Sequence, residues 1–579
     1  MTGRELDVSR SHRSMRHLRR RAVGVVAAVV VAAVALSGCS GIPRSGGVNE
    51  GGDIAGPVAA DIEFLPAGPV ADAAPAVILR GFLEAASSPQ NDFAIARQFL
   101  TPVASDTWNP SSMTLVDSGV RPSSELSDTS ISIGVDASAV LDAEGRFTQQ
   151  QSPVHVDVAY TFERVGGQWR IGGLPPGIVI DKNTFLQVFR QTSLYFLSPD
   201  NRRLVPDVRW FPSRASTTTR IVKALLEGPS AWLSSTGAAT SAFPPGTTLV
   251  ADAVPVQDGV AIVDLSAQSL RASVVAKSLM KIQLEASLTQ VSTVRSVELQ
   301  ILGSTQRSQG TGVTVAQMMP TVDARPVVIR DGKLGLLSSA SVEVLTRVGT
   351  RGVDLSTVTA GTLSSDGSRL AVVTAEGVWA TDTTGSLTLR DSRPGLVAPA
   401  VDDYGNVWTV PRNDPSQVQT YAADGTMTLV TVPWVDADSI VSLRLSVDGQ
   451  RAVIMYVVDD RTRVVVASVA RDERGIPSEL GTPIDLVAPA GYPVDAVWLD
   501  AITVAVAGSD GSGNGSIVRQ VVGGESQSYA RAGSVVSLSG GSAVTQLHVL
   551  KRDGVLDQPR GTTAWYVTAT GITALLTVQ

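Results

Sequence analysis

The chain has 579 residues, of which 43% are hydrophobic and 17% charged, with one cysteine and four histidines. That length corresponds to about three or four domains, and the apolar fraction excludes a disordered or fibrous chain. A single cysteine excludes an intramolecular disulfide and a thiolate cluster for zinc or iron–sulfur. Four histidines argue against a histidine-rich metal site, and we expect neither a metal nor a cofactor.

Charge is distributed unevenly along the sequence. The whole chain carries −7, but its first 39 residues hold seven arginines and two acids. The remainder has 40 basic and 52 acidic residues, which is a net charge of −12. Phosphates repel a body with that balance, so we expect no nucleic-acid partner.

The first forty residues have the pattern of an export signal. Six arginines between residues 10 and 21 precede an uncharged run, residues 22–36, that is short for a membrane span of about twenty residues. The run ends in Leu36-Ser37-Gly38-Cys39, which resembles a bacterial lipobox. The resemblance implies that residues 1–38 are removed as a signal peptide and that Cys39 becomes an N-palmitoyl, S-diacylglycerol cysteine. The alternative is an uncleaved signal anchor with an incidental cysteine.

Residues 39–69 are rich in glycine, alanine and proline and predict a flexible tether. In residues 70–188, helical periodicity at 75–86 and 93–100 gives way to strand alternation from Ser130 and around Val154, then to a hairpin turning at Gly166-Gly167. Helices followed by a meander and a tryptophan hairpin resemble an α+β NTF2-like domain, which is cone-shaped.

His155 and Asp157 alternate with the apolar residues of the strand around Val154. They therefore either line the interior of the cone, where polar groups make some such domains enzymes, or form the solvent side of a half-buried strand.

Residues 189–304 hold an ordered set of short motifs. They predict strands at 193–196 and 204–209, a helix at 218–226 stopped by Gly228-Pro229, a turn at 244–247 into a strand, a hairpin at 257–266, a helix at 274–288 and a strand at 294–301. This order closely resembles the GerMN domain of extracytoplasmic Gram-positive proteins, an α+β module understood to be non-catalytic. Asp264 is either a lone functional carboxylate or a polar strand end.

From residue 326 to the end, short strands recur after turns that contain aspartate. Aligning the copies on Asp366, Asp403, Asp448 and Asp500 gives spacings of 37, 45 and 52 residues. A blade of four strands needs about 40–50 residues, so 326–579 predicts an all-β propeller of five or six blades, with tandem β-sandwiches as the alternative. The glycine-rich segment 508–516 lacks the spacing and lysine of a phosphate loop and predicts an inter-strand loop.

The succession of lipobox, NTF2-like region (70–188), GerMN domain (189–304), linker (305–325) and propeller (326–579) resembles the LpqB lipoproteins of actinobacteria. The resemblance implies a lipid-anchored protein on the extracytoplasmic face of the cell membrane. It further implies an accessory role, through contact with the MtrB sensor kinase, in the MtrAB two-component system of cell-wall homeostasis and division.

Two other functions remain open. The chain contains no Gly-x-Ser-x-Gly, His-Glu-x-x-His or Gly-Lys-Ser/Thr motif, so we expect no enzyme and assign no catalytic residue. A propeller glycoside hydrolase stays possible, because its two carboxylates need not be neighbours in sequence. The second alternative binds cell-wall polysaccharide or peptidoglycan without catalysis.

Overall fold

The computed structural model describes residues 66–213, 216–306, 322–339 and 341–579. The predicted signal peptide, Cys39, nearly all of the tether and most of the predicted 305–325 linker lie outside these residues. The described residues fall in one compact unit, Glu63–Gln579. Each helix of this part of the chain falls short of the length and apolar character that a membrane crossing requires.

The first region is α+β, as predicted. Its helices are α2 (Pro75–Ala85), α3 (Ala94–Arg97) and α4 (Pro102–Thr107), and its strands are β1 (Met113–Asp117), β2 (Ser123–Ser127), β3 (Ser130–Asp142), β4 (Phe147–Val165), β5 (Gln168–Gly173) and β6 (Ile178–Asp181). The strands form one sheet in the order β5-β4-β3-β1-β6, with β2 on the edge of β3. Helix α2 buries Ile78, Leu79 and Phe82 in the core, and the β4–β5 hairpin turns at Gly166 and Gly167 with positive φ angles.

The predicted helix at 93–100 is much shorter than expected. Phe93 has a φ of 59°, in the left-handed region, so the helix begins only at Ala94. It ends at Arg97 because Phe99 and Leu100 turn toward β5, where the Thr101 and Ile171 amides complete the backbone bonding. Apolar spacing alone does not distinguish one helical turn from two.

The second region follows the predicted element order closely. Helix α5 (Lys182–Val188) ends the first region. The second region then comprises β7 (Phe189–Leu197), β8 (Leu204–Pro212), α6 (Thr217–Glu227), α7 (Ala231–Ser234), β9 (Val256–Gln257), β10 (Val260–Leu265), η1 (Ala267–Arg271), α8 (Val274–Leu288), β11 (Ser296–Ile301) and β12 (Ser304–Thr305). Gly228 ends α6 with a φ of 100°, and Ser273 caps α8 by accepting a bond from the Ala276 amide. The strand expected after the 244–247 turn is absent from the described elements: only the isolated bridge between Leu249 and Leu265 forms there.

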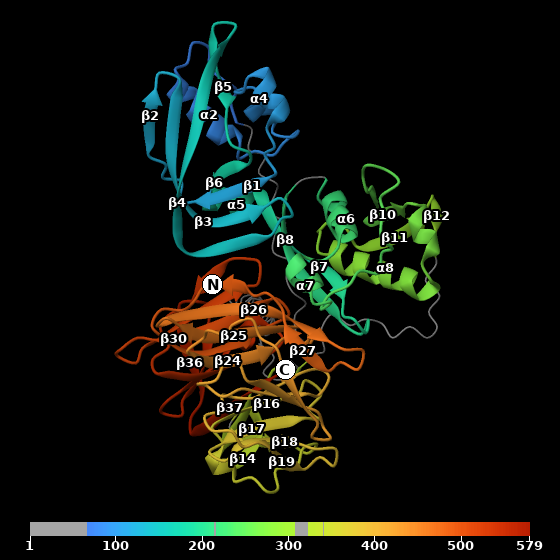
Figure 1. The fold of residues 1–579 in the computed structure, drawn as a ribbon, viewed down its shortest axis with the longest axis vertical. Coiled ribbons are helices and arrows are strands. Elements are labelled where there is room, and N and C mark those ends of the chain that lie inside the picture. Colours follow the sequence, from blue (N-terminus) through green and yellow to red (C-terminus); the bar gives the residue numbers. More distant parts are fainter. Residues whose placement is uncertain (1–65, 214–215, 307–321, 340) are drawn as a thin grey trace, which may run out of the picture. The chain divides into compact units, whose positions relative to one another are not determined.

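The third region is a propeller (Figure 1). Its strands form six groups of four, and one of these groups carries a fifth short strand on its edge. Its strands are β13 (Val327–Arg330), β14 (Lys333–Ser338), β15 (Ser341–Val344), β16 (Ala360–Leu363), β17 (Leu370–Thr374), β18 (Gly377–Thr381), β19 (Leu387–Asp391), β20 (Ala400–Val401), β21 (Val407–Thr409), β22 (Val418–Tyr421), β23 (Met427–Val430), β24 (Ser439–Leu445), β25 (Arg451–Val458), β26 (Arg461–Arg471), β27 (Pro477–Leu480), β28 (Ile484–Leu486), β29 (Tyr492–Trp498), β30 (Thr503–Ser509), β31 (Gly515–Val521), β32 (Ser526–Ser528), β33 (Val535–Ser539), β34 (His548–Lys551), β35 (Leu556–Arg560), β36 (Ala564–Ala569) and β37 (Ile572–Val578).

The two ends of the propeller sequence close the ring. Strand β37 pairs antiparallel with β13, so the C-terminal strand supplies the innermost strand of the blade that β13, β14 and β15 begin. The innermost strands β16, β20, β24, β29, β33 and β37 contact one another in turn, and β37 pairs with β16. The all-β propeller prediction is therefore confirmed, with six blades, and tandem sandwiches are excluded.

The aspartates used to align the repeats lie in the turn that follows the innermost strand. The carboxylates of Asp366, Asp448 and Asp500 each accept a bond from the backbone amide two residues later. In the blade that begins with β20, Asp402 makes this bond to the Tyr404 amide, so the alignment on Asp403 was wrong by one residue. Asp403 instead forms an ion pair with Arg203, at 2.8 Å.

Candidate functional site

Strand β8 joins all three regions of the chain. Every one of its nine residues is buried. The Trp210 backbone amide donates to the Gly145 carbonyl oxygen at 2.8 Å, in the turn between β3 and β4, and its indole Nε1 donates to the Gly523 carbonyl oxygen of the propeller at 3.0 Å. One strand of the second region is thus bonded to both the first region and the propeller.

Four aromatic rings fix the position of this strand. Trp210 lies with its ring centroid 5.3 Å from that of Phe147 and 5.1 Å from that of Phe185, and Phe185 stacks on Phe189 at 4.9 Å. All four side chains are buried in the core of the first region. Such contacts add to the hydrophobic free energy of burial, so the connection between the regions is a packed core.

A buried ion pair lies beside these rings. The Asp207 carboxylate accepts from Arg209 Nη2 at 2.8 Å and from the Ser230 amide at 2.8 Å. Both charged side chains are less than 5% exposed. Arg209 Nη1 also donates to the Glu144 carbonyl oxygen at 2.8 Å, which fixes the β3–β4 turn against β8.

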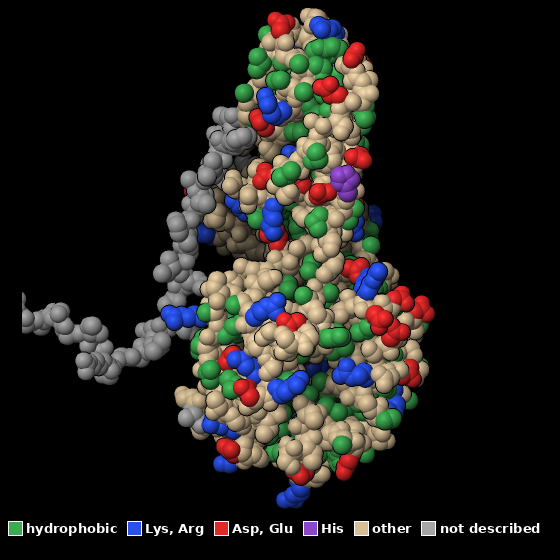
Figure 2. Space-filling model, turned by 90° about the vertical axis from the view of Figure 1, so that its left-hand side faces the viewer, with side chains coloured by type: hydrophobic (Ala, Val, Ile, Leu, Met, Phe, Trp, Pro, Cys, Tyr) green, Lys and Arg blue, Asp and Glu red, His purple; other side chains and the backbone are tan. Residues whose placement is uncertain are grey.

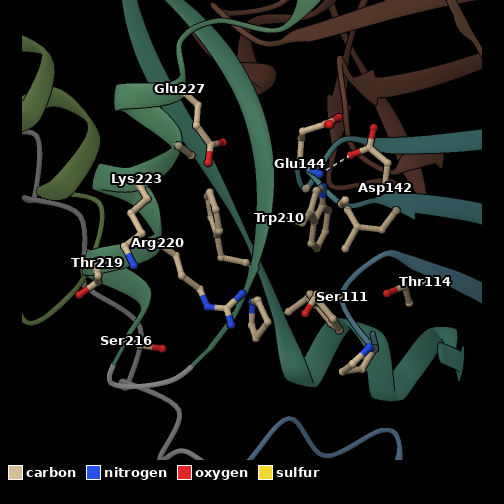
Figure 3. Close-up of a pocket in the computed structure, with 18 of the residues that line it drawn as sticks. Ser111, Thr114, Asp142, Glu144, Trp210, Ser216, Thr219, Arg220, Lys223 and Glu227 are labelled. Atoms are coloured by element: carbon tan, nitrogen blue, oxygen red, sulfur yellow. Dashed lines mark hydrogen bonds between the residues drawn. The ribbon is translucent and has the colours of Figure 1, made fainter. Parts of the chain in front are cut away.

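A pocket of about 450 Å³ opens between the β3–β4 turn and helix α6 (Figure 3). Its buried lining is largely aromatic and apolar, with Phe189, Trp210 and Phe211 among its members. Its charged lining comes mainly from two elements, the β3–β4 turn and α6, and Asp252 adds a carboxylate from the loop before β9. An apolar interior with a few charged groups at a domain junction is the usual composition of a small-molecule site.

The charged groups of the two walls differ in their partners. On the turn, Arg146 Nε binds the Asp142 carboxylate at 2.6 Å and Nη2 binds Glu144. Although partial burial opposes it, the hydrogen bond and charge of Asp142 raise the pKa of Arg146. On α6, no hydrogen bond or ion pair with another described residue reaches the side chain of Arg220 or Lys223. The free cations of the described pocket lining therefore belong to the helix.

A glycoside hydrolase site in the propeller channel would need two facing carboxylates. Among the six described innermost strands, Asp495 is the one acidic residue. Its oxygens accept from Ser442 Oγ and from the Leu538 amide, both at 3.0 Å, and Arg444 lies 3.8 Å away. Burial lowers the pKa of Arg444. These strands thus supply one carboxylate, and neighbouring blades already bind it.

The sequence-predicted candidates occupy separate places. His155 and Asp157 lie on the solvent side of β4, and His155 Nδ1 contacts the Asp136 carboxylate across the strand pair at 2.7 Å, which raises the pKa of His155. Asp264 accepts from the Gly303 amide at 2.9 Å and so stabilises the β11–β12 turn. Segment 508–516 covers the end of β30, the turn at 510–514 and the start of β31. The described residues contain no cluster of His, Cys, Asp or Glu suited to a metal ion.

Sequence reasoning missed Arg220 and Lys223. Their three-residue spacing on a predicted helix was visible, but so is the same spacing on many solvent-exposed helices. Only the β3–β4 turn, about 75 residues earlier in the chain, makes the space next to α6 a pocket.

Three domain families match this chain in the order of the three regions. The N-terminal domain of lipoprotein LpqB matches residues 68–186, the family described as sporulation and spore germination matches 193–307, and the LpqB β-propeller domain matches 332–574. The chain belongs to the LpqB lipoprotein family.

Two relatives in this family match over most of their length. Lipoprotein LpqB of Bifidobacterium longum is 28% identical over 78% of this chain and 79% of its own. Lipoprotein LpqB of Thermobifida fusca is 26% identical over 89% of this chain and 94% of its own. Among solved structures, the first GerMN domain of the sporulation protein GerM from Bacillus subtilis is 23% identical, covering 22% of this chain and 92% of that domain, with a TM-score of 0.18.

Proposed function

We propose that this LpqB family member is anchored by lipid to the extracytoplasmic face of the cell membrane. It binds the extracytoplasmic region of an MtrB-type sensor kinase and modulates MtrAB signalling in cell-wall homeostasis and division, without catalysis. The family match over three consecutive domains is the observation that carries the proposal. The kinase as partner comes from the family resemblance.

The anchor is the Cys39 lipid. Two or more acyl chains hold a protein stably at a membrane, where a single chain holds it only marginally. The composition of residues 39–69 predicts a flexible tether with a root-mean-square span of about 30 Å. A body confined in this way meets a membrane-held partner at high effective concentration, so a weak interface suffices.

The described structure supports a binding role. The contacts of Trp210 and Arg209 join three domains through buried groups, which preserves the relative position of their surfaces. Preorganised surfaces lose little conformational entropy when a partner binds. The single, already bonded carboxylate on the innermost strands argues against glycoside hydrolysis there.

Regulation requires that the lipoprotein binds the signalling states of the kinase with different affinities, because equal binding shifts no equilibrium. A net charge of −12 after residue 39 predicts that the contact is partly electrostatic. Acidic and basic side chains are both spread over the face shown in Figure 2. We therefore expect affinity to fall as salt rises from 50 to 500 mM, by an amount that reports the number of charge contacts.

The test combines the full-length lipidated chain and the full-length kinase in one lipid nanodisc. We expect co-purification at low salt and a changed rate of kinase autophosphorylation. The Cys39→Ala variant, which should not insert into the nanodisc, is the matched control for confinement. If the lipidated chain fails to bind at low salt, and response-regulator phosphorylation is unchanged in a deletion strain, the kinase role is wrong.

The second candidate function is binding of cell-wall polysaccharide or peptidoglycan. The pocket between α6 and the β3–β4 turn favours it, because its free charges and aromatic lining suit a small ligand better than a protein surface. Retention of the full-length protein on purified cell-wall sacculi, compared with an unrelated acidic lipoprotein, tests this function. Equal retention of the two proteins would contradict it.

A further inference from the structure

The pocket beside α6 has the size and lining of a binding site for a small molecule. Its volume of about 450 Å³ lies within the range of about 300–1,000 Å³ typical of such sites. Trp210 and Phe211 are 6% and 7% exposed, so their rings provide an apolar lining. This apolar lining of the pocket favours a ligand with at least one apolar group.

Helix α6 presents charges of both signs to this pocket. Arg220, Lys223 and Glu227 follow one another at intervals of three and four residues, so they lie on one face of the helix. In Figure 3, Arg220 extends from α6 into the space between the helix and the opposite wall, and Glu227 lies at the other end of the helix. Within the described part of the chain, none of these three side chains has a hydrogen bond or ion pair.

Arg220 differs in this respect from the arginines near the pocket. The other arginines near the pocket are engaged: Arg146 binds Asp142 and Glu144, and Arg209 binds Asp207. Arg220, Lys223 and Glu227 of α6 are therefore charged groups that a ligand can neutralise.

The lining also selects against polyanions. Besides Glu227, it contains the carboxylates of Asp142, Glu144 and Asp252, against the two cations of α6. A phosphate dianion or an acidic polymer would bring more negative charge beside these four acids. A ligand with one carboxylate and one ammonium group adds no net charge. Its carboxylate can pair with the two cations of α6, and its ammonium can pair with Glu227.

The distance between Arg220 and Glu227 along α6 sets the length of that ligand. Seven residues separate Arg220 from Glu227, which corresponds to about 10 Å along an α-helix at 1.5 Å per residue. An extended peptide spans about 3.3–3.6 Å per residue, so three residues place the terminal ammonium and carboxylate about 10 Å apart.

We propose that the pocket between α6 and the β3–β4 turn binds a short zwitterionic peptide of about three residues. Its carboxylate binds Arg220 and Lys223, its terminal ammonium binds Glu227, and a central apolar side chain packs on Phe211 and Trp210. This inference is independent of the kinase contact. A free peptide carries both charged ends, whereas a wall peptide, whose amino end is acylated by the glycan, carries no terminal ammonium, so blocked probes distinguish these two sources.

The test uses the full-length chain in detergent micelles and the tripeptide Ala-Phe-Ala, with binding measured by isothermal titration calorimetry. The matched probes are the C-terminal amide, which lacks the carboxylate, the N-acetyl peptide, which lacks the ammonium, and the doubly blocked peptide. We expect the free tripeptide to bind and each single block to weaken binding about tenfold, which is the effect of losing about 1.4 kcal/mol of binding free energy.

Substitutions in the protein test the same charge contacts as the blocked peptides. Arg220→Ala should weaken the free tripeptide about tenfold while Arg220→Lys keeps part of the affinity, and Glu227→Gln should weaken the free but not the N-acetyl peptide. Arg271→Ala, at an exposed arginine of the same domain outside the pocket, should bind like the wild type. Equal thermal midpoints of all four variants show that folding is intact.

Several results would overturn the proposal. It is wrong if the free tripeptide does not bind the wild type, if the doubly blocked peptide binds equally well, or if Arg220→Ala changes nothing. If the N-acetyl peptide binds as tightly as the free peptide, the ammonium contact is wrong and an acylated wall peptide becomes the favoured ligand. Inorganic phosphate binding at the same residues more tightly than the tripeptide would likewise exclude the zwitterion.

Discussion

The buried pair of Asp207 and Arg209 gives the sharpest prediction about how this protein is held together. Asp207→Ala removes the acceptor of the Arg209 guanidinium and of the Ser230 amide. Because Arg209 stays more than nine-tenths buried, its positive charge is left without the opposing carboxylate. This lowers the free energy of unfolding by about 3–5 kcal/mol. For a folding unit of about 150–250 residues, that corresponds to a thermal midpoint lowered by roughly 6–20 °C.

The assay is thermal unfolding of the full-length chain followed by circular dichroism. Asp323→Ala is the matched control, because Asp323 pairs with Arg325 at the surface, and the exposed pair contributes at most about 1 kcal/mol. The double variant Asp207→Ala/Arg209→Met should unfold at a higher temperature than Asp207→Ala, since it removes the uncompensated charge as well as its partner. A loss in Asp207→Ala no larger than in the control would refute the reasoning.

Three further predictions concern other parts of the chain. Cys39→Ala should abolish labelling by a palmitate analogue and release the protein from membranes; continued labelling would contradict the lipobox reading. Leu576→Ala, in the buried closing strand β37, should cost about 2–5 kcal/mol and admit early protease cuts within the propeller, whereas cuts confined to residues 304–312 would argue against closure by β37. Burial lowers the pKa of His548 to about 4, below its usual 6.5, so its neutral form stabilises the fold above pH 6.5 and that stability is lost as pH falls toward 4. His548→Gln should therefore show less acid destabilisation over that window than the wild type, by an amount on the order of 3 kcal/mol, and equal pH profiles would contradict this role.

The sequence by itself determined most of the local structure. Helix α8 spans the predicted residues 274–288, and α6 stops before Gly228-Pro229 as predicted. The hairpin at Asp258-Gly259 forms because both residues adopt positive φ angles. These features depend on residues a few positions apart, so they are readable along the chain. The repeated aspartate turns predicted the propeller for the same reason, although the register at Asp402 was missed.

Only the tertiary structure decided how these elements meet. Pairing of β37 with β13 joins residues about 240 positions apart, and the local sequence of either strand does not identify its partner strand. The same is true of Trp210, whose backbone and indole bind two carbonyl oxygens from different regions, and of Arg220, whose pocket exists because the β3–β4 turn packs near α6. Burial and hydrogen bonding of these groups depend on long-range packing. Segments that are distant in sequence pack around each residue and exclude water from it.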